Sequence, residues 1–399
     1  MLRIIVSLVL ACLLIDATVA SARTVSHPIF QQPADFTTLM NESRAAIQSK
    51  RFDKAINLLK QALTLQPDSA QANYELAISY INLHRYELAI APAAAAAARL
   101  DPEHLFAHLN LGYAYEFTRQ FDKAAEAYQK AIQVNPQSAA PFNYLGAMAG
   151  RRGIYEEEIE WYRKAVALKA DYDTAWTNMG MALNKQGKPL EAIEAFQQAL
   201  RANPNNFKAN FFLAGTNWRL LRLEETVLAY QQVLRLNPRE PEALRTQSLA
   251  LFGLQRNEEA VANLRAYLRY YGWRDHSAPF LGILAHFALR RANQPAEARQ
   301  MLDEAVQQAD MTIWPAPLIR FLRDELTEKE LTEQANHPDK LTEMHTYLGL
   351  TALLSKQREP ALEHFNWVKQ FGNRQFVEYP LAIIELKHLS GRPAPPPKR

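Results

Sequence analysis

Apolar residues recur three and four places apart along most of the chain, and short polar stretches interrupt them at regular intervals. Such a pattern predicts amphipathic helices that are joined by tight turns. Prolines at 67, 102, 136, 204 and 238 are separated by 34 or 35 residues, or by twice 34. A period of this length predicts stacked helical hairpins. The repeating segments are 36–69, 70–104, 105–138, 139–172, 173–206, 207–240 and 241–274.

Small residues occupy the eighth place of most segments, namely Ala77, Gly112, Gly146, Gly180 and Ala214. We expect a minimal side chain at this place to let the two helices of a hairpin approach closely. Aromatic residues of the second helix, such as Tyr128 and Phe196, are expected to fill the space between neighbours. The closing proline in "NPQS" and "NPNN" should end each second helix, because proline disfavours helical geometry in the residue before it.

The order of residues in "NLGYAYEFTRQFDKAAEAYQKAIQVNP" and "WTNMGMALNKQGKPLEAIEAFQQALRANP" resembles the tetratricopeptide repeat (TPR). The resemblance extends over seven units, residues 36–274. It implies an all-α fold, a TPR α-solenoid in which helix-turn-helix hairpins form a right-handed superhelix. In that family the first helix of each unit lines a concave face, and stacked neighbours bury apolar surface that one hairpin alone cannot bury.

The period breaks beyond the seventh unit. Residues 275–309 are expected to form a divergent repeat, and 310–341 an insertion that contains Trp314 and two prolines. Residues 342–389 should form a final repeat followed by a capping helix, whose apolar positions 377, 381, 384 and 386 suit packing on the last hairpin. Residues 390–399 are proline-rich and are expected to be a disordered tail.

This carboxyl-terminal portion is similar to the last third of the NlpI-type bacterial envelope lipoproteins. The similarity rests on Trp314, Phe321-Leu322, Leu326-Thr327, Leu331, Tyr347-Leu348-Gly349, Ala361, Phe365 and "QFVEYPLAIIEL". It implies an adaptor of the bacterial envelope that gathers proteases and murein hydrolases and that forms a homodimer.

The amino terminus, "MLRIIVSLVLACLLIDATVASA", has an early cation, an apolar run and a small-residue exit. This order predicts a signal peptide over 1–22, a linker over 23–35, cleavage after Ala20 or Ala22, and export to the periplasm without membrane insertion after cleavage. The one cysteine, Cys12, lies in the apolar run. We interpret Cys12 as a hydrophobic residue of that run, and lipid anchoring through Cys12 is the alternative.

Composition and motifs indicate a protein that is not an enzyme. The net charge is +3, which is too small to indicate nucleic-acid binding. The sequence lacks GxGxxG, a phosphate loop, GxSxG and CxxC, so no cofactor is expected. His104 and His108 have a spacing that could share zinc, but His108 takes the place filled by Phe142 and Trp176 in the next units, which indicates packing and no metal site.

Consecutive carboxylates point in different directions on a helix, so we expect Glu156, Glu157 and Glu158 to form an exposed face.

The predicted binding site is the concave face. Its lining is expected from the inward places of each unit: Tyr74, Phe106, Asn110, Tyr113, Phe117, Asn143, Tyr144, Asn178, Phe211, Phe212, Trp218 and Phe252. Aromatic side chains provide a large contact area at low entropic cost, and amides can bond a peptide main chain. The alternative is that the aromatic rings pack against neighbouring helices and that the amides bond within the solenoid.

These features predict an exported, non-enzymatic adaptor that binds proteins or extended peptides. The alternative is a non-catalytic TPR subunit of a glycosyltransferase-type complex, because long arrays with inward asparagines also resemble the non-catalytic arm of O-linked N-acetylglucosamine transferases.

Overall fold

The computed structural model describes residues 35–99 and 104–391. The predicted signal peptide, Cys12 and nearly all of the predicted tail lie outside these residues. Within them the regular structure consists of 21 helices and no strand, which confirms the all-α prediction. No helix in residues 35–99 and 104–391 is both long and apolar enough to cross a membrane.

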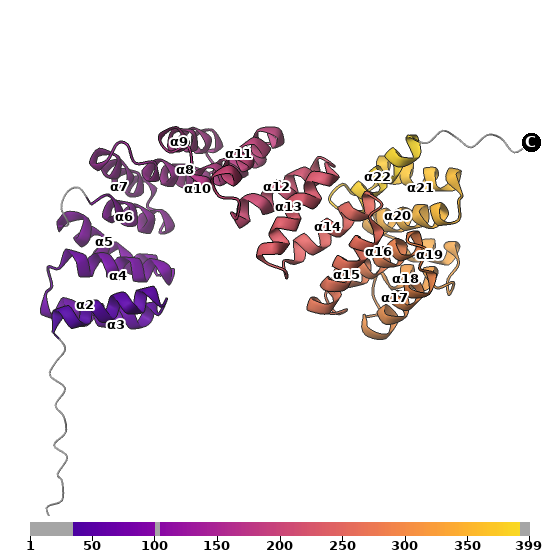
Figure 1. The fold of residues 1–399 in the computed structure, drawn as a ribbon, viewed down its shortest axis with the longest axis horizontal. Coiled ribbons are helices and arrows are strands. Elements are labelled where there is room, and N and C mark those ends of the chain that lie inside the picture. Colours follow the sequence, from indigo (N-terminus) through magenta and orange to yellow (C-terminus); the bar gives the residue numbers. More distant parts are fainter. Residues whose placement is uncertain (1–34, 100–103, 392–399) are drawn as a thin grey trace, which may run out of the picture. The chain divides into compact units, whose positions relative to one another are not determined.

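The described helices fall into two compact units, and each unit is a succession of hairpins in which every helix contacts the next in the chain order (Figure 1). The first unit contains α2 (Phe36–Gln48), α3 (Phe52–Leu65), α4 (Ala70–Asn82), α5 (Tyr86–Arg99), α6 (Leu105–Phe117) and α7 (Phe121–Val134).

The second unit begins with four further hairpins of the same kind. They are α8 (Ala140–Arg152) with α9 (Tyr155–Leu168), α10 (Asp173–Lys185) with α11 (Pro189–Ala202), α12 (Phe207–Arg219) with α13 (Leu223–Leu236), and α14 (Pro241–Gly253) with α15 (Asn257–Tyr271). The remaining helices are α16 (Ala278–Arg291), α17 (Pro295–Gln308), α18 (Ala316–Leu322), α19 (Glu328–Gln334), α20 (Pro338–Leu354), α21 (Arg358–Phe371) and α22 (Glu378–Ser390).

The glycines at the eighth place are sites of close helix approach, as the spacing predicts. A Cβ atom added to Gly146 would lie 2.7 Å from Cε1 of Tyr162, and one added to Gly180 would lie 2.6 Å from Cε1 of Phe196. Contacts this short do not occur between real Cβ atoms and rings, so only glycine permits the observed packing. The aromatic ring of the second helix occupies the volume that a larger side chain would need.

The prolines end the second helices in the manner expected. Helices α3, α11 and α13 each stop at the residue two places before a proline. The intervening residues Gln66, Asn203 and Asn237 have φ between −133° and −143° and ψ between 82° and 93°, which is outside the helical region. The clash of the proline ring with the preceding residue favours this geometry at the ends of α3, α11 and α13, whereas Lys169 after α9 adopts it without a following proline.

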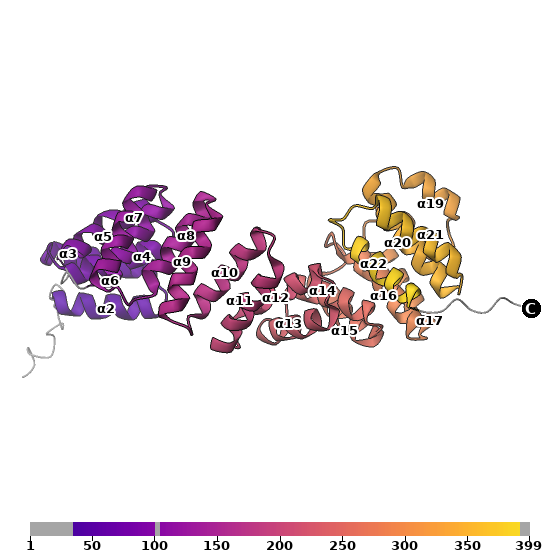
Figure 2. The same ribbon diagram turned by 90° about the horizontal axis from the view of Figure 1, so that it is seen from above.

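Helix α22 does more than cap the last hairpin. It contacts α20 and α21, as the sequence predicts, but it also reaches back to α14, and α22 lies beside α20 and α21 in both views (Figure 1 and Figure 2). Leu381 and Ile384 of α22 are buried in a core that continues from α13 to α22. The carboxyl-terminal helix is thus an internal part of the second unit.

Candidate peptide-binding pocket

In the first unit, aromatic rings gather on α5 and α6. The ring of Phe117 stacks on Tyr86 with centroids 4.4 Å apart and lies 4.5 Å from the ring of Tyr113. Phe106 lies about two helical turns before Tyr113 on the same face of α6, and its side chain is 57% exposed. Three of the predicted lining residues, Phe106, Tyr113 and Phe117, therefore belong to one aromatic surface of α6, and their role in binding stays a prediction.

Two other predicted residues of the first unit lie nearby. Tyr74 of α4 makes an edge contact with His104, with ring centroids 4.9 Å apart. Asn110 is partly exposed on α6. His104 also lies edge-on to Phe106 at 6.4 Å, so rings from two consecutive hairpins meet at this histidine.

In the second unit the predicted asparagines bond to each other. Asn178 Nδ2 donates to Asn143 Oδ1 at 3.1 Å, and Asn143 is only 7% exposed. The neighbouring Tyr144 is partly exposed. For this pair the amides therefore bond within the solenoid, which is the alternative to peptide binding. Asn178 is the more accessible amide of the two.

Phe211 packs within its own hairpin, and Phe212 packs against the preceding hairpin. Phe211 stacks on Phe207 at 6.1 Å and lies edge-on to Tyr230 at 6.1 Å. Phe212 stacks on Phe196 at 6.3 Å. Both rings are only partly exposed, so each has one face that is engaged in the core.

The prediction is wrong for Phe252, which is fully buried. The guanidinium of Arg291 from α16 lies 4.2 Å from the Phe252 ring centroid. Glu385 of α22 in turn lies 2.8 Å from Arg291 Nη1. The return of α22 therefore closes the surface that Phe252 would have lined.

Trp218 lies at an open pocket, which we call the Trp218 pocket. Its volume is about 620 Å³, and its lining is more apolar than polar. The lining comes from the end of α12 and the turn after it, from the end of α21, from the segment that joins α21 to α22, and from the start of α22. The residues are Trp218, Arg219, Leu221, Lys369, Arg374, Gln375, Phe376, Val377, Tyr379, Pro380 and Ile383. Pockets of this size and composition suit the side chains of a bound peptide.

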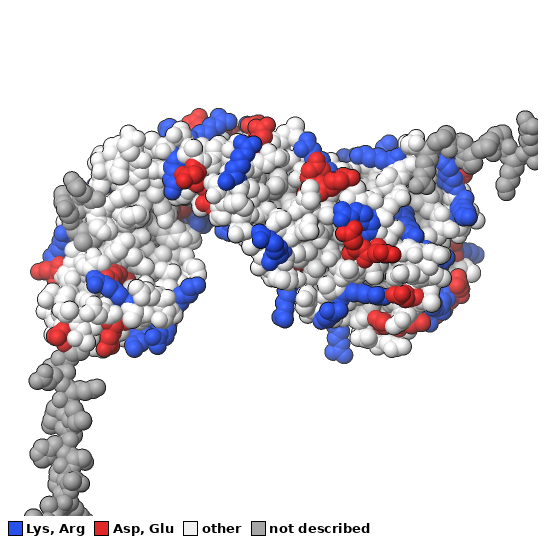
Figure 3. Space-filling view, viewed as in Figure 1, with Lys and Arg blue, Asp and Glu red and all other residues white. Residues whose placement is uncertain are grey.

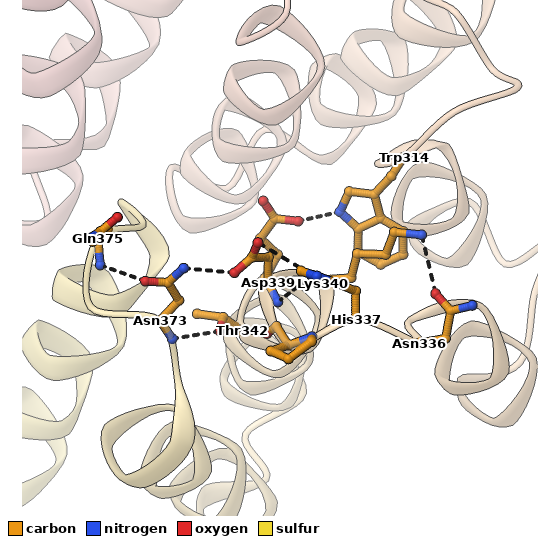
Figure 4. A network of polar contacts seen from close by, with 10 residues as sticks. Trp314, Asn336, His337, Asp339, Lys340, Thr342, Asn373 and Gln375 are labelled. Atoms are coloured by element: carbon orange, nitrogen blue, oxygen red, sulfur yellow. Dashed lines mark hydrogen bonds and ion pairs between the residues drawn. The ribbon is translucent and has the colours of Figure 1, made fainter.

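The α21–α22 segment is held in place by polar contacts to α20 (Figure 4). The Asn373 backbone N–H donates to Thr342 Oγ1 at 2.9 Å, and Asn373 Nδ2 donates to Asp339 Oδ1 at 2.7 Å. The Gln375 N–H donates to Asn373 Oδ1 at 3.0 Å, which closes the turn around Arg374. These bonds position Arg374 and Phe376 at the Trp218 pocket.

Buried carboxyl groups support the start of α22. The Trp314 indole N–H donates to the Glu343 carboxyl group (Figure 4), and the Tyr347 hydroxyl donates to Glu378 Oε1 at 3.0 Å. Burial, together with the nearby Glu378, raises the pKa of Glu343 from 4.5 to about 8. Burial also raises the pKa of Glu378. Since Glu343 and Glu378 are 5% and 3% exposed, their contacts stabilise the fold and do not face a ligand.

The remaining candidates for chemistry are a metal site and the acidic run at 156–158. Among residues 35–99 and 104–391, no group of three or more His, Cys, Asp or Glu side chains could hold a metal ion. The expectation of an exposed acidic face is wrong for Glu158, which is 5% exposed and lies against Gly150, whereas Glu156 and Glu157 are exposed. Burial raises the pKa of Glu158, which disfavours its charged form.

The charged side chains of both signs are interspersed on the face shown in Figure 3, without a continuous stripe of one sign. The repeat pattern predicts Trp218 as a lining residue but does not indicate Lys369, Arg374 and Tyr379, which complete the pocket. The carboxyl-terminal aromatic and basic residues in "KQFGNRQFVEY" were an available signal, but nothing in the sequence pairs them with α12.

Three segments of the chain match family models described as tetratricopeptide repeat, namely 46–91, 106–138 and 174–206. These matches confirm TPR repeats in those segments. Together with the succession of hairpins, they identify the fold as an all-α solenoid built from tetratricopeptide repeats.

Two curated proteins share part of this sequence. Small glutamine-rich tetratricopeptide repeat-containing protein 2 of Mycosarcoma maydis is 32% identical over 100 residues, which is 25% of this chain and 28% of that protein. Protein O-mannosyl-transferase TMTC3 of Mus musculus is 31% identical over 110 residues, which is 24% of this chain and 12% of that protein. The chain thus spans only 28% and 12% of the lengths of these relatives.

Solved structures are similar over about half of the chain. YrrB, described as a TPR protein with an unusual peptide-binding site, has 23% identity and a TM-score of 0.43 over 51% of this chain and 100% of that chain. PilF of Pseudomonas aeruginosa has 20% identity and a TM-score of 0.44 over 51% of this chain and 91% of that chain.

Proposed function

We propose that this protein is a non-enzymatic adaptor that binds protein or peptide segments at the Trp218 pocket. The repeats fit a role in protein interaction, and the observation that carries the proposal is the pocket itself. It presents the partly exposed rings of Trp218, Phe376 and Tyr379 around a volume of about 620 Å³. Exposed aromatic rings in a preformed depression are typical anchors for a partner chain.

Site-specific photo-crosslinking tests this proposal. A photoreactive phenylalanine analogue replaces Tyr379 in the full chain, which is expressed in its own cells and irradiated. A matched control places the same analogue at Leu228, which is 63% exposed on α13 and does not line the pocket. We expect discrete protein adducts from position 379 and not from 228. Equal labelling at both positions would argue against the pocket as the binding site.

We further propose export to the periplasm. The supporting observation is the charged start, apolar run and small-residue exit of residues 1–22. Fusion of these residues to alkaline phosphatase, which is active only outside the cytoplasm, should give an active enzyme. An inactive fusion would contradict export. Metabolic labelling with palmitate, compared between the native chain and Cys12→Ser, distinguishes a cleaved signal from a lipid anchor.

The clients that we propose are envelope proteases and murein hydrolases, with the protein acting as a homodimer. Support comes from the similarity of residues 314–386 to the NlpI-type lipoproteins. Mass spectrometry of the adducts at position 379 tests the clients, and sedimentation of the purified chain tests the dimer. If the adducts contain neither class of enzyme, these clients are rejected, while the proposed adaptor role still stands.

A role as a non-catalytic subunit of a glycosyltransferase-type complex is the second candidate. The similarity to the O-mannosyl-transferase named above favours it, although that similarity covers 12% of that protein. Sugar-transferase activity that co-purifies with the native chain, and that is lost when the chain is removed, would support this candidate over the first.

A further inference from the structure

The walls of the Trp218 pocket carry positive charge only. Arg219 at the end of α12, Lys369 on α21 and Arg374 in the α21–α22 segment all line it, and no aspartate or glutamate is part of the lining. All three side chains are exposed. Within residues 35–99 and 104–391, none of the three forms an ion pair with a carboxylate, so their charges are available to a ligand.

The carboxylate closest along the chain does not neutralise this charge. Glu378 is 3% exposed and is held by the Tyr347 hydroxyl at 3.0 Å, on the buried side of α22. Because burial raises its pKa, the group is also less prone to carry a negative charge. The pocket therefore presents an excess of cations that lacks a counter-charge from its own walls.

The floor of the same pocket is apolar. Leu221, Val377 and Ile383 contribute aliphatic surface, while Trp218 and Tyr379 contribute ring faces. The guanidinium of Arg374 lies 5.9 Å from the Tyr379 ring centroid, so the basic group and the ring form one surface. A ligand that fits must combine negative charge with an apolar side chain.

The pocket is preorganised for such a ligand. Asn373 and Gln375, on either side of Arg374, are fixed by the hydrogen bonds to Asp339, to Thr342 and to each other (Figure 4). A backbone that is fixed before binding loses less conformational entropy when the partner arrives.

From this charge and shape we propose that the Trp218 pocket binds an acidic, extended segment of a partner protein, with one large apolar side chain seated between Trp218 and Tyr379 and flanking carboxylates paired with Arg219, Lys369 and Arg374. The inference rests on the proposed adaptor function and names the chemistry of the client. Residues 392–399 of this chain are a poor occupant, since they contain Arg392, Lys398 and Arg399 and no acidic residue.

Fluorescence anisotropy with synthetic peptides tests the inference on the purified full chain. The main probe is a labelled twelve-residue peptide in which aspartates and glutamates flank one phenylalanine. Three further peptides replace the acids by their amides, replace the phenylalanine by serine, or amidate the carboxyl terminus. A fifth peptide is "SGRPAPPPKR", which is taken from this chain. We expect the acidic peptide with phenylalanine to bind, and either replacement to weaken binding by about tenfold or more.

Charge reversal supplies the matched protein variants. R219E/R374E should weaken binding of the acidic peptide by about tenfold or more, whereas K208E/R320E reverses two exposed cations outside the pocket and should change it by less than about twofold. Circular dichroism of both variants confirms that they fold. Binding of the acidic peptide should also weaken as the salt concentration rises, because exposed charges are screened.

The outcomes separate the inference from the adaptor function. If the amide peptide binds as tightly as the acidic one and Trp218→Ala abolishes both, the pocket binds peptides without selecting charge, and only this inference fails. Tighter binding of "SGRPAPPPKR" than of the acidic peptide would assign the pocket to the chain's own carboxyl-terminal segment and overturn the inference. Loss of binding when the carboxyl terminus of the acidic peptide is amidated would assign the pocket to a terminal carboxylate, which also overturns the inference. If no peptide binds and position 379 yields no adducts, both the inference and the proposed function fail.

Discussion

Glu385 on α22 forms an ion pair with Arg291 on α16, with 2.8 Å between Oε1 and Nη1, and their side chains are only 3% and 15% exposed. The two atoms are close, but the N–H does not point at the oxygen, so the contact is coulombic and is not a hydrogen bond. The same guanidinium covers the Phe252 ring of α14. This pair thereby connects α22 to two helices, α14 and α16, that lie much earlier in the sequence.

Replacement of Glu385 by alanine should destabilise the second unit by about 3 to 5 kcal/mol, because it leaves a largely buried guanidinium without its counter-charge. Urea denaturation gives the free energy of unfolding. Glu297→Ala is the control, since Glu297 pairs with Arg265 at 2.5 Å but both side chains are more than 40% exposed. The control should cost less than about 1 kcal/mol. Equal costs for the two variants would mean that the buried pair does not hold α22.

Gly146→Leu should destabilise the second unit by about 1 to 3 kcal/mol, because the new side chain must displace the Tyr162 ring that lies 2.7 Å from the Cβ position. Thermal melting measures the change. Leucine at the adjacent Ala147, which is partly exposed, is the matched control and should have little effect on the melting temperature. Unchanged melting of Gly146→Leu would refute the close approach of α8 and α9.

The stability of the second unit should fall as pH rises from about 4.5 to about 8. The pKa of Glu343 is raised from 4.5 to about 8 in the folded chain, so the folded state holds a proton that the unfolded state has released over this range. The protonated form therefore favours folding fully below pH 4.5, and this contribution is lost as pH approaches 8.

Glu343→Gln tests this dependence, because the amide does not titrate while its oxygen can still accept the Trp314 N–H. The variant should be more stable than the native chain at pH 8.5 by on the order of 1 to 4 kcal/mol, with a smaller difference at pH 5. Chemical denaturation at the two pH values measures the effect. Glu363→Gln, at an exposed position, is the control. Parallel pH profiles for Glu343→Gln and the native chain would contradict the prediction.

Asn373→Ala should loosen the α21–α22 segment without changing any residue that lines the Trp218 pocket. The change removes the bond to Asp339 and the acceptor for the Gln375 N–H. We expect faster amide hydrogen exchange across residues 372–377 and a loss of about 1 to 2 kcal/mol in stability. Asn366→Ala alters an exposed asparagine of α21 and should leave the exchange unchanged. Unaltered exchange in Asn373→Ala would show that other contacts hold the segment.

The repeats were predictable because each hairpin is determined by residues within one period. Gly180 meets Phe196, its partner in the same hairpin, and Asn203, whose non-helical geometry Pro204 favours, ends the second helix. Spacing, small residues and prolines are local signals, so the sequence alone was sufficient to place the hairpins and the all-α fold.

The packing of α22 against α14 in the second unit was not predictable in the same way. Ile384 lies 3.2 Å from the position of a Cβ atom on Gly253, yet neither residue departs from an ordinary amphipathic pattern. The burial of Phe252 and the presence of Trp218 and Tyr379 in one pocket both depend on the packing of α22 against α12 to α14. Periodicity indicates which face of a helix is apolar, but it does not indicate which distant helix will cover that face.

The separation of α22 from α14 along the chain affects how the protein can be made. On the ribosome the apolar surface at Gly253 emerges early, and residues 254–390 must be synthesised before all of α22 can cover it. At translation rates of about 5 to 20 residues per second, this surface stays uncovered by α22 for roughly 7 to 27 seconds. The nascent chain therefore presents an apolar surface to chaperones during that interval, and the emergence of α22 ends it.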